Sequence, residues 1–275
     1  PGSCLAPNEV ADIGMICGGN VTVYFQYFDP ADENGRALLP AIREILNAND
    51  HMDQIVANIR GMSFGRLRIG TFASASVLWL PNIKEDFRHD SPGIQIEIIV
   101  GGNDSLISQL DESCIDFAIM SNPPQGYEWI HLASDRMLVL LPPGHRLVDK
   151  DRVTLDEIDD DPFILSNEGF DYDVSQIIKG SGITPRLSFS TMENRGIIAM
   201  IQHGLGVTVM PEMVLDSLES NVITKELAPC EYRHMGIIVK SVNTASLAAK
   251  TFISYAKRII SELGTYPPID GELNA

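Results

Sequence analysis

The sequence predicts an α/β fold of two lobes, and three observations support this prediction. With 275 residues and 44% hydrophobic content, the chain can bury a core for one large or two modest domains. From Arg66 onward, short β-prone runs alternate with segments of helical spacing. The alternation continues through a second stretch from Arg136 to Leu218, which implies a second α/β lobe.

Residues 1–31 differ in character from the rest of the chain. The glycine pair Gly18-Gly19 precedes a strongly β-prone run, NVTVYFQYF, which Asp29-Pro30 ends. We expect a strand or a hairpin here. No pair of helices with a basic recognition helix is visible, so this segment is not expected to be a helix-turn-helix.

Residues 32–64 are expected to form a linker helix that associates with a second copy. Apolar residues recur in alternating four- and three-residue steps, as in a coiled-coil seam, at Leu38, Ile42, Ile45, Met52, Val56 and Ile59. Asn49 takes the one missing seam position, where a buried Asn fixes register and strand number. A helix docked on its own domain would carry the same stripe, so that interpretation stays open. Pro40 is tolerated only if the helix begins just before it.

The first lobe is expected to begin with residues 65–134. Its pattern is βαβαβ, with strands at 66–72, 94–100 and 117–120 and helices at 78–87 and 104–110. A βαβ unit joins parallel strands through right-handed crossovers. This part of the chain should therefore form a parallel sheet.

The second lobe is expected at residues 135–240. Strands are predicted at 136–143, 162–167, 187–191 and 207–211, with helices at 174–179, 194–203 and 213–218. A late strand at 236–240 can run back from this lobe, so the apolar helix that follows it at 246–260 should pack on the first lobe. The first lobe would then be discontinuous, taking in residues 241–263, and residues 264–275 would form a flexible tail.

Charge and cysteine content limit the classes of function. Lys and Arg total 20 against 37 Asp and Glu, a net charge of −17, which opposes nonspecific binding of nucleic acid by this chain alone. Cys4, Cys17, Cys114 and Cys230 are scattered, with no disulfide or zinc pattern, which fits a reducing cytoplasm. No apolar run is long enough to cross a bilayer and no signal peptide is seen, so neither a membrane partner nor secretion is expected.

Two polar turns of the first lobe are candidate ligand contacts. Ser74 and Ser76 follow the first strand, where their hydroxyls and the free backbone N–H groups of Ala75 and Ser76 can hold a carboxylate or a similar anion. Serine capping of a helix uses the same geometry without a ligand. In the turn GGNDS, one of Asn103, Asp104 and Ser105 should cap the next helix, and ligand contact is an open alternative.

Further candidates come from the lobe junction and the second lobe. Ser121 and Asn122 end a strand, where they either line a cleft or form a hinge turn. Ser166 and Glu168 follow a second-lobe strand, while Met192 and Glu193 precede a helix whose dipole alone would favour an acidic residue. Gly206 would allow close backbone approach in the cleft.

Catalytic and metal-binding patterns were not found in the sequence. There is no GxSxG elbow, HExxH pair or Walker loop, and GLGV lacks the setting of a dinucleotide fingerprint. The acidic run DEIDDD at 156–161 lacks the spacing of a metal loop and is interpreted as a solvated turn. We therefore expect neither an enzyme nor a bound cofactor or metal.

The ordered series of motifs from residue 35 to 260 resembles the effector-binding domain of LysR-type transcriptional regulators. The motifs include GRLRIGTFASASVLWLPNIKEDF, GGNDSLISQLDESCIDFAI, RMLVLLPPGHRL and MENRGIIAMIQHGLGVTVMPE. The resemblance implies a type 2 periplasmic-binding-protein-like fold, in which two α/β lobes joined by two crossing strands hold a small-molecule effector between them. It also implies a dimerising linker helix, a homodimer or homotetramer, and DNA binding only through a helix-turn-helix that is not recognisable in this chain.

Residues 1–31 resemble the CGG-containing part of accessory proteins for molybdenum-hydroxylase (xanthine dehydrogenase) maturation. On that interpretation Cys17 could contact the molybdenum cofactor, although a free cysteine is more often a bystander. Two alternatives to a regulator therefore stay open. One is a transport-type solute-binding protein with the same two lobes, and the other is a maturation factor.

Overall fold

The computed structural model describes residues 10–16, 19–24, 33–59, 65–122, 125–166, 172–191, 193–218, 220–264 and 266. The chain divides into two compact units, Pro1–Ile45 and Leu46–Ala275. In the first unit, β1 (Val10–Ile16) and β2 (Gly19–Tyr24) pair as an antiparallel hairpin. A strand or a hairpin was expected in residues 1–31, and the described residues form a hairpin, while Cys17 lies outside the described residues.

The linker helix α1 runs from Glu33 to Ile59. The prediction for Pro40 is wrong, because the helix begins seven residues earlier and continues through it. Pro40 lacks the N–H that would bond to the carbonyl of Arg36, so the helix loses one internal hydrogen bond there. Exposed apolar side chains include the seam residues Ile42, Ile45, Met52 and Val56, and also Leu46 and Ile55 beside the seam.

Lobe I is the part of the second unit that contains β3 to β5, α2 to α4 and α8. The three strands β3 (Gly65–Thr71), β4 (Ile94–Val100) and β5 (Phe117–Ser121) are parallel, with β3 between the other two. The expected helix at 78–87 is instead two helices, α2 (Ala73–Leu78) and α3 (Leu80–Asp90). Pro81 cannot donate to a preceding carbonyl but fits the first turn of a helix, so α2 ends and α3 begins beside it.

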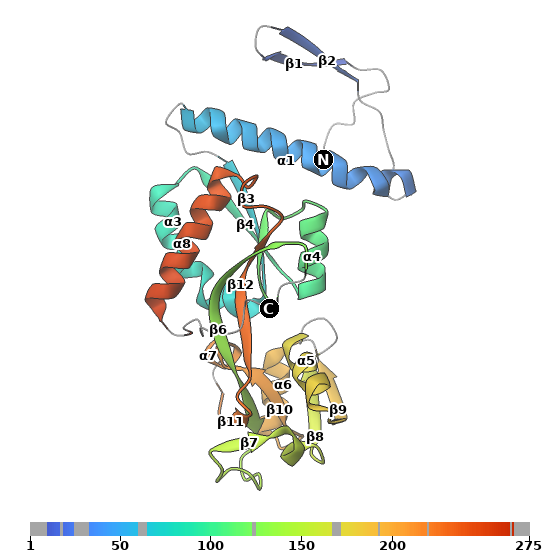
Figure 1. Cartoon of the computed structure of the whole chain (residues 1–275), viewed down its shortest axis with the longest axis vertical. Helices are drawn as coiled ribbons and strands as arrows, with labels where there is room; N and C mark the ends of the chain where they lie inside the picture. Colours follow the sequence, from blue (N-terminus) through green and yellow to red (C-terminus); the bar gives the residue numbers. More distant parts are fainter. Residues whose placement is uncertain are drawn as a thin grey trace. The chain divides into compact units, whose positions relative to one another are not determined.

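Lobe I has helices on both faces of its sheet. Along β5, Phe117 and Ile119 join one hydrophobic core, while Ala118 and Met120 join another, because alternate side chains of a strand point to opposite faces. The first core also takes residues from α3 and α8 (Leu247–Leu263), and the second takes residues from α4 (Asn103–Asp111). Figure 1 shows α3 and α8 side by side, with α4 across the sheet from them.

Helix α8 closes lobe I from the far end of the chain. Its Phe252 ring lies 5.3 Å from the ring of Phe87 in α3 and 5.7 Å from that of Phe117 in β5, measured between centroids. The Ser246 hydroxyl accepts a hydrogen bond from the Ala249 N–H at 3.1 Å, which caps the start of the helix. The hydrophobic core of lobe I is therefore completed by sequence that follows lobe II.

Two long strands, β6 (Glu128–Leu141) and β12 (Tyr232–Val239), connect the lobes. β12 pairs antiparallel with residues 128–136 of β6, and Figure 1 shows the two strands running together between the lobes. The strand order in the large sheet is β4-β3-β5-β12-β6-β11-β7, and β10 also pairs with β6. The sheet is mixed, because β12 is antiparallel to both β5 and β6.

Lobe II is built on the second half of β6. Its remaining elements are β7 (Arg152–Thr154), the 3₁₀ helix η1 (Leu155–Ile158), β8 (Pro162–Ser166), α5 (Tyr172–Ser181), β9 (Arg186–Thr191), α6 (Asn194–Gln202), β10 (Thr208–Pro211), α7 (Glu212–Asp216) and β11 (Ile223–Ala228). Met137, Val139 and Leu141 of β6 enter one core, and Leu138 and Leu140 enter another. The predicted α/β character of this lobe is confirmed, and β7 and β11 were not anticipated.

Candidate ligand-binding cleft

A cleft with a volume of about 500 Å³ lies between the two lobes. Lobe I contributes the starts of α2 and α4 and the end of β5, while lobe II contributes the starts of α5 and α6 and one side of α7. Its lining residues are Phe72, Ala73, Ser74, Val77, Val100, Gly101, Gly102, Asn103, Ser121, Asp173, Glu193, Asn194, Arg195, Met210, Pro211, Val214, Ser217, Leu218 and Arg233. Of the candidates named from sequence, Ser74, Asn103, Ser121 and Glu193 lie along it.

The start of α2 is less open than the sequence suggested. The Ser76 N–H bonds to the carbonyl of Phe72 at 3.1 Å, and the Ser76 hydroxyl donates to the carbonyl of Ala73 at 2.6 Å. The expectation of a free N–H at Ser76 is therefore wrong, because this group already makes the first hydrogen bond of the helix. Ala75 is fully buried in the lobe I core and does not line the cleft.

The predicted side-chain cap of α4 is also wrong. Gly102 occupies the cap position, and no side chain accepts a capping hydrogen bond there. Asn103 instead donates to the carbonyl of Ser121 at 3.0 Å and so ties α4 to the end of β5. Asp104 and Ser105 are exposed outside the cleft lining, and the Ser105 hydroxyl accepts a hydrogen bond from Gln109 at 3.1 Å.

Arg233 forms the buried floor of the cleft. Its guanidinium donates to the Asp135 carboxylate at 2.8 Å and to the Ser74 hydroxyl at 3.2 Å, and it lies 4.8 Å from the ring centre of Phe72. Asp135 also accepts a hydrogen bond from the Met213 N–H at 3.1 Å. Arg233 on β12 thus links a strand shared by both lobes to α2 of lobe I.

Asp173, near the start of α5, bridges the lobes. It accepts hydrogen bonds from the Ser121 hydroxyl at 2.9 Å and from the Asn122 amide at 2.6 Å, both at the end of β5. Its nearest charge partner is Arg233, at 4.0 Å. Asn122 has a left-handed backbone with φ of 48°, so it turns the chain out of β5 while lying outside the cleft lining.

Burial raises the pKa of both cleft-floor carboxyl groups. For Asp173 and for Asp135, loss of solvation is the main cause, and the charge of Arg233 opposes it in each case. The Ser121 and Asn122 hydrogen bonds also lower the pKa of Asp173. The Arg233 guanidinium is therefore the cationic partner of two buried carboxyl groups, those of Asp135 and Asp173.

On the lobe II side, Glu193, Asn194 and Arg195 lie at the start of α6 and line the cleft. Gly206 does not line it. A side-chain carbon at Gly206 would lie 2.3 Å from the carbonyl of Pro162, so the close approach is to β8 and not to the cleft. Ser166 ends β8 without a described side chain, and Glu168 and Met192 lie outside the described residues.

Sequence reasoning missed Arg233, Asp135 and Asp173. The sequence carried no clear signal for Asp135 or Arg233, because they stand in the polar stretches SDR and EYRH, ahead of the apolar runs of the crossing strands. Asp173 carried none either, since an acidic residue in the first turn of a helix is common.

Two mixed α/β lobes, joined by paired crossing strands around a polar cleft, define an effector-binding domain of the periplasmic-binding-protein type. The LysR substrate binding domain family matches residues 60–260. The chain is 31% identical over 229 residues to the uncharacterized HTH-type transcriptional regulator YvbU of Bacillus subtilis (strain 168), covering 82% of this chain and 78% of YvbU. The chain therefore belongs to the LysR family of transcriptional regulators and carries its substrate-binding domain.

Other similar proteins support the same fold. The transcriptional activator CmpR of Synechocystis sp. (strain ATCC 27184 / PCC 6803 / Kazusa) is 23% identical over 231 residues, covering 81% of this chain and 75% of CmpR. Among solved structures, the effector binding domain of QuiR in complex with shikimate matches with a TM-score of 0.65 and 19% identity, over 73% of this chain and 99% of that one. The BenM effector binding domain with benzoate matches with a TM-score of 0.63 and 20% identity, over 74% and 95%.

These matches confirm the resemblance to LysR-type regulators and do not support the transport-type alternative. The family match begins at residue 60, and the comparisons give no support to a similarity of residues 1–31 to molybdenum-hydroxylase accessory proteins or to the maturation-factor alternative. Among the described residues, no cluster of three or more His, Cys, Asp or Glu could hold a metal ion. Within the same residues, no helix is both long enough and apolar enough to cross a membrane.

Proposed function

We propose that the protein senses a small carboxylate, which binds between the lobes and alters a homodimer or homotetramer that controls transcription in the cytoplasm. The cleft itself carries this proposal. Its 500 Å³ are within the range of small-molecule sites, and both lobes line it. Shikimate and benzoate, bound by two proteins of similar fold, are carboxylates of this size.

The start of α6 supplies the groups that would bind the carboxylate. Arg195 is exposed at the cleft and makes no ion pair with another described residue, unlike Arg233, which Asp135 already holds. The first N–H groups of a helix are unsatisfied within the helix and attract anions, and here the start of α4 faces the same cleft. Phe72, Val100 and Met210 give the body of the ligand an apolar wall.

Binding would act by favouring the closed arrangement of the lobes. A ligand that contacts α4 of lobe I and α6 of lobe II binds best when both are in reach, so it shifts the population toward that arrangement. The hydrogen bonds from Ser121 and Asn122 to Asp173 join the same two lobes. Lobe closure would then change the relative orientation of the copies in an assembly joined through α1. DNA would be bound through a helix-turn-helix of the kind found in the family.

The test is binding of benzoate and shikimate to the full chain by isothermal titration calorimetry, with neutral benzamide as the matched control. We expect benzoate or shikimate to bind and benzamide to bind at least tenfold more weakly. Arg195→Gln should weaken carboxylate binding by roughly tenfold or more, because a hydrogen bond to a charged group contributes about 1.5–3 kcal/mol.

Arg88→Gln is the matched control for this charge change. Arg88 is exposed in the last turn of α3, outside the cleft, so carboxylate binding by this variant should equal that of the wild type. Equal losses in both variants would show only a general effect of net charge. Carboxylate binding that survives unchanged in Arg195→Gln would overturn the proposed binding mode.

A further inference from the structure

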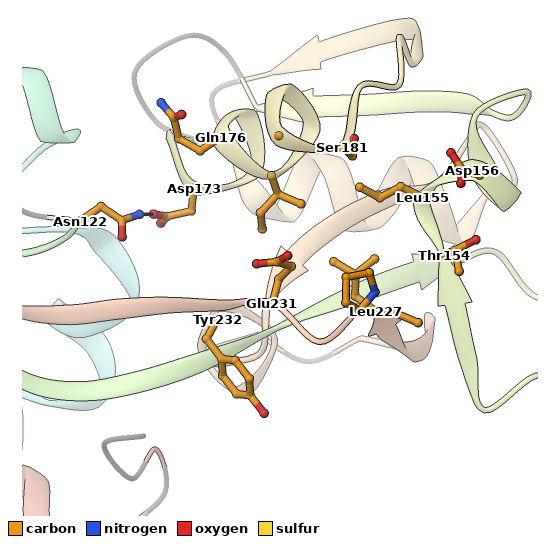
Figure 2. A pocket seen from close by; sticks show the side chains of 14 residues that line it. Asn122, Thr154, Leu155, Asp156, Asp173, Gln176, Ser181, Leu227, Glu231 and Tyr232 are labelled. Carbon is orange, nitrogen blue, oxygen red and sulfur yellow. Dashed lines mark hydrogen bonds between the residues drawn. The ribbon is translucent and has the colours of Figure 1, made fainter. Parts of the chain in front are cut away.

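A second cavity, of about 570 Å³, lies in lobe II on the other side of Asp173 from the cleft. It is bounded by α5, by the 3₁₀ helix η1 and by the turn between β11 and β12. Figure 2 shows Asp173 beside Asn122 at one end, Thr154 and Asp156 at the other, and Glu231 between them. Asp173 lines both this cavity and the interlobe cleft.

The lining of this cavity combines an apolar surface with carboxylates. Leu155, Ile177, Leu227, Ala228 and Pro229 give apolar contact, and Tyr232 adds an aromatic ring. The charged residues are Asp156, Asp173 and Glu231, and no Lys, Arg or His is among the described residues that line the cavity. The cleft differs, because its lining combines Arg195 and Arg233 with the acidic residues Asp173 and Glu193.

These carboxylates lack cationic partners close by. Neither Asp156 nor Glu231 forms an ion pair with another described residue, and the charge nearest to Asp173 is the Arg233 guanidinium at 4.0 Å. That guanidinium is held at 2.8 Å by Asp135, so two buried carboxylates share one cation. A buried negative charge without compensation is costly, and a cation in the adjoining cavity would offset that cost.

We propose that this cavity binds a small organic cation, namely a primary amine on an apolar or aromatic body. The ammonium group would lie beside Asp173 and Glu231, and the body would extend over the leucine, isoleucine and proline side chains toward Thr154 and Asp156. A bare metal ion fits less well, because the apolar side chains of Leu155, Ile177, Leu227, Ala228 and Pro229 offer it no ligand.

The site is coupled to the cleft through Asp173. An amine near Asp173 would neutralise the charge that now attracts Arg233. If the bound amine changes the affinity of the cleft for an anion, a bound anion must change the affinity of the cavity for the amine by the same factor. Asp173 is the one lining residue that the two sites share, and Glu231 and Asp156 line the cavity alone, so variants of these two residues test amine binding separately from carboxylate binding in the cleft.

Calorimetric titration of the full chain with phenethylamine, and with 2-phenylethanol as its uncharged counterpart, tests the proposal. We expect saturable binding of the amine and at least tenfold weaker binding of the alcohol. The double variant Glu231→Gln with Asp156→Asn should weaken amine binding at least tenfold. The charge-matched control, Glu85→Gln with Asp149→Asn, changes two exposed acidic residues outside the cavity and should leave amine binding unchanged.

Three results would overturn the inference. They are absence of saturable amine binding, equal binding of amine and alcohol, and equal weakening by the cavity and control variants, which would reveal general attraction to a chain of net charge −17. Benzoate titration of the same variants separates the two sites. The cavity variant should keep any benzoate binding that the wild type shows, because neither Glu231 nor Asp156 lines the cleft.

Discussion

At the scale of single residues, Asp173 links the pH of the solution to the stability of the cleft. Burial raises its pKa above the ordinary value of 3.8, so the folded protein binds this proton more tightly than the unfolded chain. The stabilising contribution of Asp173 is therefore fully present below about pH 3.8 and is lost as pH rises through its folded-state pKa.

Asp173→Asn removes this titration and gives a testable pH dependence. The free energy of unfolding of the variant, minus that of the wild type, should increase as pH rises from about 4 to 7, because only the wild type acquires the buried charge. Urea unfolding at several pH values measures this difference. Glu85→Gln, an exposed change, should alter stability by less than about 0.5 kcal/mol throughout. A pH-independent difference for Asp173→Asn would contradict the assignment.

Individual cleft residues could be predicted where they follow a strand. The prediction failed where the role of a residue depends on a partner far along the chain. Ser74, Asn103 and Ser121 could be placed because polar groups at the carboxyl ends of parallel strands meet at one edge of a sheet. Asp135 and Arg233 meet only because β6 pairs with β12, across 98 residues of sequence. Gly206 was wrongly assigned to the cleft. Its close approach is to Pro162, and this contact depends on how β8 lies beside it in the fold.

At the scale of secondary-structure elements, α8 holds lobe I together through Phe252. The ring is fully buried between Phe87 and Phe117, so Phe252→Ala should lower the free energy of unfolding by about 3–5 kcal/mol. Urea or thermal unfolding measures this loss. Leu247→Ala is the control on the same helix, because Leu247 is 49% exposed and its truncation should cost less than about 1 kcal/mol. A small effect of Phe252→Ala would show that α8 is not part of the lobe I core.

The type of each long element could be predicted, whereas its ends often could not. Helices α5 and α6 lie within two residues of the predicted ranges, because their apolar spacing is regular. The break between α2 and α3 was missed because hydrophobic spacing continues across Pro81. Strand β11 has the mixed sequence ITKELA, whose composition does not indicate a strand. It is a strand because it pairs with β6 and β7.

At the scale of the whole molecule, the exposed seam of α1 predicts self-association. Ile45 is 69% exposed, and Ile42, Met52 and Val56 on the same seam are also exposed in the single chain. Sedimentation velocity should show a dimer or a tetramer. Ile45→Glu should shift the chain toward monomer, because a charge in an apolar seam is poorly solvated. Ala37→Glu changes an exposed position off the seam and should keep the assembly. A wild type that is monomeric at all concentrations would contradict the dimerising interpretation of α1.

The two-lobed architecture could be predicted because alternation of strands and helices restarts after β6. The order of strands within the shared sheet could not, since β12, β11 and β10 all pair with β6 from distant parts of the chain. The predicted boundaries between the lobes, at residues 134/135 and 240/241, stay predictions. The crossing strands belong to both lobes, so a single cut does not describe them.

The position of α8 at the end of the chain sets the order in which a nascent protein can complete its parts. Strands β3 to β5 leave the ribosome first, but the Phe87 and Phe117 rings gain Phe252 only after lobe II has been synthesised. The strands and helices of lobe II, from β7 to β11, have all emerged by then. Because chains generally fold as they are made, lobe II can become native first, while the earlier part of lobe I has one sheet face covered by α3 but not yet by α8.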